Sequence, residues 1–246
     1  MKKMFQKITN KLFKFININP IFLSPPYEYV QSVCNANIHK YLSLTAKDIK
    51  SWCIVGGYLG NEIFTIKKKY PNVKINIFEC SERYANKLSD KFKKNKDIIV
   101  VKKACSLSGG SQIFFETSLK GSGSLLELGP LAKKSYNAKQ QESFTVSTIA
   151  LDDYYKDYES LDILQIDVQG AEKLVLEGAK NLLNKTRAVL IEISILEGLY
   201  KNSCTFIEIF RIMEKNNFKL ILLGTDFNLT GNALFINSSD KVTYNN

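Results

Sequence analysis

From Ser51 onward, short apolar runs alternate with helical stretches, and this alternation strongly limits the folds open to the chain. Strands are predicted at 52–55, 74–78, 98–101, 162–166 and 188–193, and helices at 61–70, 82–95, 171–183 and 206–216. Strands that are joined through helices run parallel, and the helices then cover both faces of one sheet. The alternation therefore predicts an α/β fold with a mostly parallel sheet.

The end of the chain and one long insertion depart from this alternation. The segments 218–223 and 233–236 are predicted as the last two strands. The connection between them is too short for a crossover helix, so these strands are expected to pair antiparallel. Between residues 105 and 160, turns rich in Gly and Ser flank strand-like runs at 112–115 and 144–149. This insertion is predicted to form a β-hairpin or a lid.

The first part of the chain is interpreted as an N-terminal helical extension, 1–48, which precedes one larger domain, 49–246. Apolar residues recur every three or four positions between lysines in residues 1–19, which predicts a basic amphipathic helix. Prolines end this helix, and a second helix is predicted at 28–44. The first helix either packs on the main domain or makes a peripheral membrane or partner contact, and both interpretations stay open.

Composition narrows the class of function. The formal net charge is +10, but only three residues are arginines, so no nucleic-acid partner is expected, whereas a phosphate-bearing small substrate fits the charge. The five cysteines lack a metal-binding spacing, and His39 is the single histidine, so no metal is expected. No signal peptide and no run of about 20 apolar residues is visible, so a cytoplasmic protein is expected. A homo-oligomer stays open.

The turn after the first predicted strand is rich in glycine and reads Val55-Gly56-Gly57-Tyr58-Leu59-Gly60-Asn61. Glycine permits a sharp turn and lets a ligand approach the backbone at the amino end of the next helix. The spacing does not fit the dinucleotide motif G-x-G-x-x-G, which disfavours a nicotinamide oxidoreductase. We interpret the turn as a cofactor site, with an ordinary tight turn as the alternative.

An acidic residue, Glu79, directly follows the second predicted strand, about 20 residues beyond the glycine turn. A carboxylate at this place can accept two hydrogen bonds from a ribose diol. The alternative is a solvated loop glutamate. Together, the turn and Glu79 indicate a cofactor that contains a nucleoside and lies over the carboxyl ends of the strands.

Further carboxylates are predicted at the same edge of the sheet. Asp167 follows a buried strand at the place where open α/β sheets bind ligands, with a helix N-cap as the alternative. Glu192 lies at the end of the next strand, and it either binds substrate or caps a loop. Glu172 lies in the first turn of a helix, where the dipole favours a negative charge, so we interpret it as mainly structural.

The segment Ile163-Leu-Gln-Ile-Asp-Val-Gln-Gly-Ala-Glu-Lys-Leu-Val-Leu-Glu-Gly-Ala179 closely resembles the hallmark of the FkbM-type S-adenosylmethionine-dependent methyltransferases. The resemblance extends from about Trp52 to Leu196. It includes the stretches 55–61, 78–79, 123–125, 146–153 and 190–192. It implies a Rossmann-like fold with a seven-stranded sheet, and an enzyme that methylates hydroxyl groups, often of sugars, glycans or polyketides.

The resemblance also assigns roles to residues. It implies that S-adenosylmethionine binds with its methionine part on the glycine turn, its ribose on Glu79 and its adenine on 104–107. It places Asp167 near the sulfonium and the substrate hydroxyl, and we take Asp167 as the first candidate for the catalytic base. His39, the single histidine, is the second candidate if the N-terminal helices fold over the site, with a surface or packing residue as the alternative. The predicted cofactor-binding residues are Gly56, Gly57, Tyr58, Gly60, Asn61, Glu79, Cys80, Ala104, Cys105, Ser106 and Asp167. The predicted substrate-binding residues are Ser122, Ser124, Gln169 and Glu192.

One position departs from the family pattern. The family usually has an acid two residues before the first glycine, where this chain has Ile54. That acid would help to hold the amino group of the cofactor directly or through water, so Ile54 leaves both the cofactor affinity and the activity open. The expected function is O-methylation of a nucleotide-activated sugar or a surface-polysaccharide component. The alternative is a non-catalytic protein with a cofactor-binding fold or a nucleic-acid-binding protein.

Overall fold

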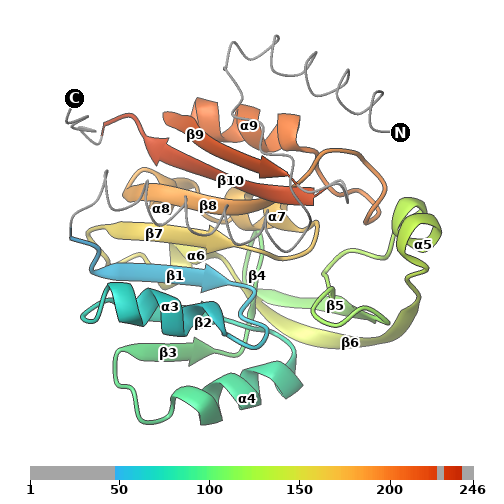
Figure 1. The fold of residues 1–246 in the computed structure, drawn as a ribbon, viewed down its shortest axis with the longest axis horizontal. Coiled ribbons are helices and arrows are strands. Elements are labelled where there is room, and N and C mark those ends of the chain that lie inside the picture. The colour runs from blue at the N-terminus through green and yellow to red at the C-terminus, as the bar shows by residue number, and fades with distance from the viewer. Residues whose placement is uncertain (1–47, 226–229, 240–246) are drawn as a thin grey trace.

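The computed structural model describes residues 48–225 and 230–239 (Figure 1). The helices predicted within residues 1–44 and the candidate base His39 lie outside the described residues, so these remain predictions. None of the described helices is long and apolar enough to cross a membrane.

A seven-stranded sheet forms the centre of the described chain (Figure 1). Its strands, in spatial order, are β3 (Ile98–Val101), β2 (Lys74–Phe78), β1 (Ser51–Val55), β7 (Leu161–Ile166), β8 (Thr186–Ser194), β10 (Thr230–Asn237) and β9 (Phe218–Thr225). The first five pair parallel, and β10 pairs antiparallel with both β8 and β9. The predicted parallel sheet and its antiparallel end are confirmed.

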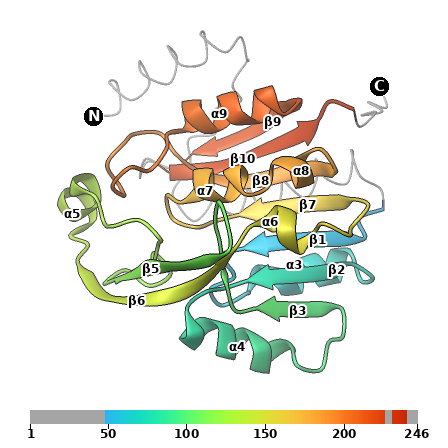
Figure 2. The ribbon, with the colours of Figure 1, turned by 180° about the vertical axis from the view of Figure 1, so that it is seen from behind.

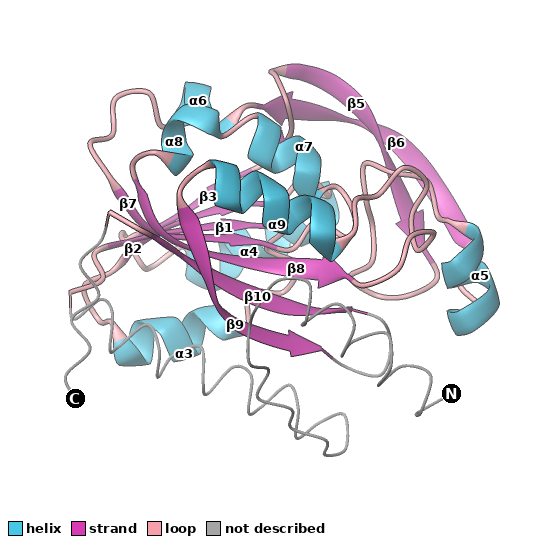
Figure 3. Ribbon diagram, turned by 90° about the horizontal axis from the view of Figure 1, so that it is seen from above, coloured by secondary structure: helices cyan, strands magenta, loops and turns pink. Residues whose placement is uncertain are grey.

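Helices cover both faces of this sheet (Figure 3). The helices α3 (Glu62–Lys69) and α4 (Glu82–Phe92) share one apolar core with the sheet. In α4, the buried residues Ala85, Leu88 and Phe92 recur at intervals of three and four, which puts them on one face. The helices on the opposite face are α6 (Leu151–Tyr154), α7 (Glu172–Glu177), α8 (Lys180–Leu183) and α9 (Phe206–Lys215).

The helix predicted at 171–183 is instead two short helices, α7 and α8, which meet at Gly178. A Cβ atom at Gly178 would lie 2.1 Å from the carbonyl oxygen of Ser106. The Gly178 carbonyl also accepts a hydrogen bond from the amide of Asp152 at 2.9 Å. The prediction of one helix was wrong because two segments distant in sequence, the loop after β4 and the first turn of α6, pack against the chain at this glycine.

The predicted hairpin is present and lies beyond the carboxyl ends of the parallel strands (Figures 1 and 2). It consists of β5 (Gly110–Thr117) and β6 (Gln140–Ile149), with α5 (Pro130–Tyr136) between them. The short β4 (Ala104–Cys105) pairs parallel with β6 and completes a three-stranded sheet. We call this unit, residues 104–149, the arm.

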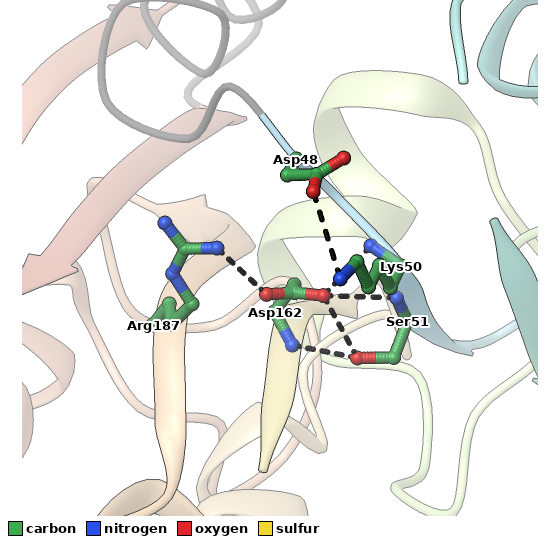
Figure 4. A network of polar contacts seen from close by, with 5 residues as sticks. All are labelled: Asp48, Lys50, Ser51, Asp162 and Arg187. Atoms are coloured by element: carbon green, nitrogen blue, oxygen red, sulfur yellow. Dashed lines mark hydrogen bonds and ion pairs between the residues drawn. The ribbon is translucent and has the colours of Figure 1, made fainter. Parts of the chain in front are cut away.

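At the opposite end of the sheet, Asp162 links the first residues of β1, β7 and β8 through hydrogen bonds (Figure 4). Its carboxylate accepts from the amides of Lys50 and Ser51 at 2.8 and 3.0 Å and from Arg187 at 2.8 Å. Burial raises the pKa of Asp162, but the Arg187 guanidinium and these amides outweigh burial, so the pKa is lowered overall. This network sets the register of β1 beside β7, and that register determines which residues meet at the carboxyl ends.

Candidate functional site

Gly56 directly follows β1 and contacts the backbone that follows β7. These two neighbouring strands lie at the point where the strand order reverses. Its φ is +91°, and a Cβ atom here would lie 1.8 Å from the carbonyl oxygen of Asp167. The Asp167 amide donates to the Val55 carbonyl at 2.9 Å, and the Gly56 amide donates to the Phe78 carbonyl at 2.9 Å. Because any side chain at position 56 would overlap the backbone after β7, only glycine fits there.

Glu79 is held at the end of β2 by backbone groups. Its two carboxylate oxygens accept from the amides of Tyr58 and Ser81, each at 2.8 Å. The residue is only 8 % exposed, so it is not a solvated loop glutamate. Burial raises the pKa of Glu79, and the hydrogen bonds from Ser81 and Tyr58 partly offset that rise. The glycine turn and the carboxylate that follows β2 are thus one connected structure.

A cavity of about 430 Å³ opens over these residues, between the carboxyl ends of the strands and the arm. Seven of the predicted cofactor-binding residues and one predicted substrate-binding residue line it. They are Gly56, Tyr58, Glu79, Cys80, Ala104, Cys105, Asp167 and Gln169. Predicted binding residues from four separate segments of the sequence therefore meet at one cavity.

The other predicted cofactor-binding residues do not line this cavity. Gly57 and Gly60 pack against α4, because a Cβ atom at either would lie within 2.8 Å of the Leu88 side chain. The Asn61 side chain accepts from Lys91 at 2.9 Å on the outer surface. The Ser106 hydroxyl is buried and accepts from Gln112 at 3.0 Å. Their predicted roles as ligands of the cofactor stay predictions.

The arm supplies a wall of the cavity, and most of the residues in this wall were not among the predicted site residues. Phe114, Glu116 and Thr117 from β5 and the loop that follows them line the cavity. Gly123 packs directly under Phe114, since a Cβ atom there would lie 2.5 Å from the ring. A Cβ atom at Gly121 would similarly lie 3.3 Å from the Tyr58 ring. The glycine-rich composition of residues 121–124 was the only sequence signal for this close packing.

Cationic and aromatic side chains also line the cavity. Arg83, Lys103 and Lys120 contribute positive charge from three different segments. The Arg83 guanidinium lies 5.5 Å from the centre of the Tyr84 ring, and the Tyr84 and Tyr58 rings are 4.7 Å apart, edge to face. No local pattern in the sequence indicates this group, because its members meet only through the fold.

The carboxyl ends of β7 and β8 form an acidic cluster beside the cavity. Asp167 and Glu192 both accept from the side-chain amide of Gln169, at 2.8 and 2.7 Å. The Tyr200 hydroxyl lies 3.2 Å from the Gln169 oxygen and 2.8 Å from the Ser122 carbonyl. Glu192 and Ser122 therefore join the site through Gln169 and Tyr200 and do not line the cavity themselves.

Two other predictions are settled by local geometry. Asp167 is not the N-cap of α7, because Ala171 occupies that position. Glu172 is buried and accepts from the amides of Gly170 and Val168 at 2.9 and 3.4 Å, so it closes the loop after β7. Burial raises the pKa of Glu172 to about 7. Ser124 is buried too, and its hydroxyl donates to the Val168 carbonyl at 3.4 Å.

Ile54 lies in the middle of the sheet and points away from the cavity. It is 0 % exposed and packs in the core beneath α3 and α4, in register with Ile77 on β2. Its neighbour Val55 lines the cavity instead. An acid at position 54 would lie mostly among apolar side chains, with Gln165 on β7 as the polar residue in register with it, so Ile54 fits the local packing.

Comparison with known protein families identifies the family of this chain. The model of the methyltransferase FkbM domain matches residues 55–220, which begin at the end of β1 and end within β9. The chain belongs to the FkbM methyltransferase family. It is therefore a methyltransferase that uses S-adenosylmethionine, and the resemblance seen in the loop after β7 is confirmed.

Solved structures of other methyltransferases resemble this FkbM methyltransferase at low identity. Precorrin-6y C5,15-methyltransferase from Geobacter metallireducens is 10% identical, with a TM-score of 0.45 over 80% of this chain and 87% of that chain. An rRNA methylase from Streptococcus thermophilus is 12% identical, with a TM-score of 0.46 over 81% and 95%. Fibrillarin from Aeropyrum pernix, solved with S-adenosyl-L-methionine, is 11% identical, with a TM-score of 0.46 over 77% and 66%. No curated protein sequence matches the chain significantly.

The cavity of this FkbM methyltransferase fits the cofactor of its family. Its volume of about 430 Å³ lies within the range of roughly 300–1,000 Å³ that small-molecule sites occupy. Gly56 lines the cavity, so a ligand can reach the backbone at the end of β1. Each oxygen of the buried Glu79 carboxylate retains acceptor capacity beyond its one backbone bond, which suits the two hydroxyls of a ribose.

Proposed function

We propose that this FkbM methyltransferase methylates a hydroxyl group of a sugar, which is carried either as a nucleotide-activated sugar or as a component of a surface polysaccharide. The observation that carries the proposal is the position of Asp167. Asp167 lines the cavity at the end of β7, and its backbone carbonyl lies directly beside Gly56 on the cofactor side. A carboxylate there can accept the proton of an acceptor hydroxyl.

The cofactor side of the cavity is assigned to Gly56, Tyr58 and Glu79. Glu79 would hold the ribose hydroxyls, and the segment that contains Ala104 and Cys105 would contact the adenine. S-adenosylmethionine, when bound, supplies an electrophilic methyl group. The residues of this chain bring the acceptor into line and exclude water, and such alignment is a large part of catalysis in a displacement reaction.

Asp167 is the proposed base. As the acceptor oxygen forms its new bond, the hydroxyl proton becomes acidic, and a carboxylate within hydrogen-bond reach removes it. Gln169 and Glu192 lie on the same side as Asp167 and are hydrogen-bonded to each other at this end of the site. A sugar presents several hydroxyls, and Asp167 lies where its carboxylate can accept from one of them.

The cations of the cavity support an acceptor that carries phosphate. Arg83, Lys103 and Lys120 line it together with the rings of Tyr58 and Tyr84. Guanidinium and ammonium groups bind phosphate oxygens, and aromatic faces stack on sugars or bases. A nucleotide-activated sugar combines these features.

The test is methyl transfer from labelled S-adenosylmethionine to a panel of acceptors. The panel contains nucleotide-activated sugars, the corresponding free sugars, polysaccharide fragments and an RNA oligonucleotide. We expect label in a sugar-containing acceptor, with mass spectrometry locating the methyl group on oxygen. Binding of S-adenosylhomocysteine without transfer to any sugar, or transfer to RNA alone, would contradict the proposal.

A further inference from the structure

The side chain of Gln169 makes all of its strong hydrogen bonds inside the protein. Its Nε2 atom donates to Oδ1 of Asp167 at 2.8 Å and to Oε2 of Glu192 at 2.7 Å. Its Oε1 atom lies 3.2 Å from the Tyr200 hydroxyl, whose single O–H is shared between this oxygen and the closer Ser122 carbonyl at 2.8 Å. A glutamine amide has two N–H donors, so both are used by the two carboxylates. Gln169 has no donor left for an acceptor molecule.

The chemistry of the neighbours fixes the orientation of this amide. The reverse orientation would direct the amide oxygen at two carboxylates, which also carry negative charge. Burial and then the charge of Glu192 raise the pKa of Tyr200, so Tyr200 keeps its proton and acts as a donor. The Tyr200 hydroxyl also lies 2.8 Å from the Ser122 carbonyl, which connects the arm to the same cluster.

The backbone of Gln169 adopts a conformation that glycine adopts more easily. Its φ is +55°, and Gly170 follows with a φ of +96°. The Tyr200 ring packs against this turn, since a Cβ atom at Gly170 would lie 2.8 Å from it. A non-glycine residue costs free energy in the left-handed region. At Gln169 the cost is offset by a side chain that bonds two carboxylates of the site.

We propose that Gln169 is a positioning residue, which holds the carboxylate of Asp167 in the orientation for proton removal and does not bind the acceptor directly. The proposal rests on the proposed function, in which Asp167 is the base. The amide N–H groups also offset the repulsion between the Asp167 and Glu192 carboxylates, which both lie within 2.8 Å of one nitrogen atom.

Two substitutions separate positioning from direct binding. Gln169→Gly removes the amide and relieves the backbone, whereas Gln169→Glu keeps the size and replaces the two N–H donors by a carboxylate. In both variants, we expect kcat for the acceptor found in the panel to fall by about 100-fold, because the Asp167 carboxylate loses the hydrogen bond that orients it. The KM for that acceptor and the Kd for S-adenosylhomocysteine are expected to change by less than about threefold.

The matched control is Asn217→Gly. Asn217 also has a left-handed backbone, with a φ of +64°, and it follows α9 outside the residues that line the cavity. This variant relieves the same kind of strain, so its kcat should equal that of the unaltered chain. Thermal unfolding checks that all three variants are folded. A raised KM with an unchanged kcat in Gln169→Gly would assign Gln169 to acceptor binding and overturn the proposal.

A second measurement needs no acceptor, so it separates failure of this proposal from failure of the proposed function. The side-chain amide of Gln169 is identified in ¹H–¹⁵N spectra as the pair of signals that disappears in Gln169→Glu. We expect these protons to exchange slowly with solvent and to shift when Asp167→Asn replaces one carboxylate. If these protons exchange rapidly and their chemical shifts are unchanged in Asp167→Asn, the proposal is overturned, whatever the acceptor panel gives.

Discussion

A Cβ atom at position 56 would lie 1.8 Å from the carbonyl oxygen of Asp167, so the candidate base and the glycine turn are in direct backbone contact. Gly56→Ala therefore has to push the end of β1 away from the end of β7, in a region where φ is +91°. We expect the free energy of unfolding to fall by about 1–3 kcal/mol or more, and S-adenosylhomocysteine to bind at least about 10-fold more weakly. Thermal unfolding and calorimetric titration measure the two effects.

The control for this substitution is Gly109→Ala. Its Cβ atom would have its nearest neighbour, the Thr148 carbonyl oxygen, at 3.8 Å, which is an ordinary contact. Both measured quantities should remain close to those of the unaltered chain. If the two variants have the same stability and the same affinity for S-adenosylhomocysteine, the close contact at Gly56 is not needed for cofactor binding.

Glu79→Gln tests the carboxylate at the end of β2. At present each oxygen accepts one backbone amide, from Tyr58 or from Ser81. A glutamine amide offers only one acceptor atom, so one buried N–H would lose its partner at a cost of about 1–3 kcal/mol. We expect the Kd for S-adenosylhomocysteine to rise about 10-fold or more, measured by titration calorimetry. The exposed Glu82→Gln serves as the control, and equal affinities in the two variants would argue against Glu79 as a cofactor ligand.

Asp167→Asn tests the proposed base. An asparagine retains an oxygen that can accept from Gln169, but it cannot take up the hydroxyl proton. We expect kcat to fall by about 10²–10⁴-fold, while the Kd for S-adenosylhomocysteine changes by less than about threefold. Asp153→Asn, at an exposed position in α6, is the matched control. Turnover in Asp167→Asn near that of the control would remove Asp167 from the mechanism.

Local sequence patterns predicted the site residues that lie at the ends of strands, but not the residues that reach the site from other segments. Glu79 and Asp167 were found because each follows an apolar strand, and the ends of parallel strands must meet at one edge of the sheet. Tyr200 and Phe114 reach the site through contacts between segments far apart in sequence, for which no local pattern exists. Gly178 broke a predicted helix for the same reason, because the contact that requires it comes from Ser106.

Glu172 predicts a measurable dependence of stability on pH. Burial raises its pKa from 4.5 to about 7, so the folded chain keeps a proton that the unfolded chain releases near pH 4.5. The free energy of unfolding should therefore fall as pH rises from about 4.5 to about 7 and level off above that, by at most about 3 kcal/mol from this group. Glu172→Gln should remove this slope and be the more stable form at pH 8.

Chemical denaturation at several pH values measures the effect of Glu172. The control is Glu214→Gln, which lies at an exposed position in α9 and should leave the slope in place. In Glu172→Gln, the new side chain retains an oxygen for the amides of Gly170 and Val168, so the loop after β7 should stay closed. An unchanged slope in Glu172→Gln would show that other groups cause the pH dependence.

Ile54 provides the sharpest test of how this chain holds its cofactor without the acid that its family usually has. Ile54→Asp would place a carboxylate at a position with 0 % exposure, among the aliphatic residues beneath α3 and α4. Desolvation of that charge costs several kcal/mol, so we expect a large loss of stability and no gain in affinity for S-adenosylhomocysteine. Ile54→Val, which removes one methyl group, should cost only about 0.5–1.5 kcal/mol. Thermal unfolding with and without S-adenosylhomocysteine distinguishes the outcomes. If the Ile54→Asp chain folds and binds S-adenosylhomocysteine more tightly, an acid at position 54 can reach the cofactor, and the expectation is wrong.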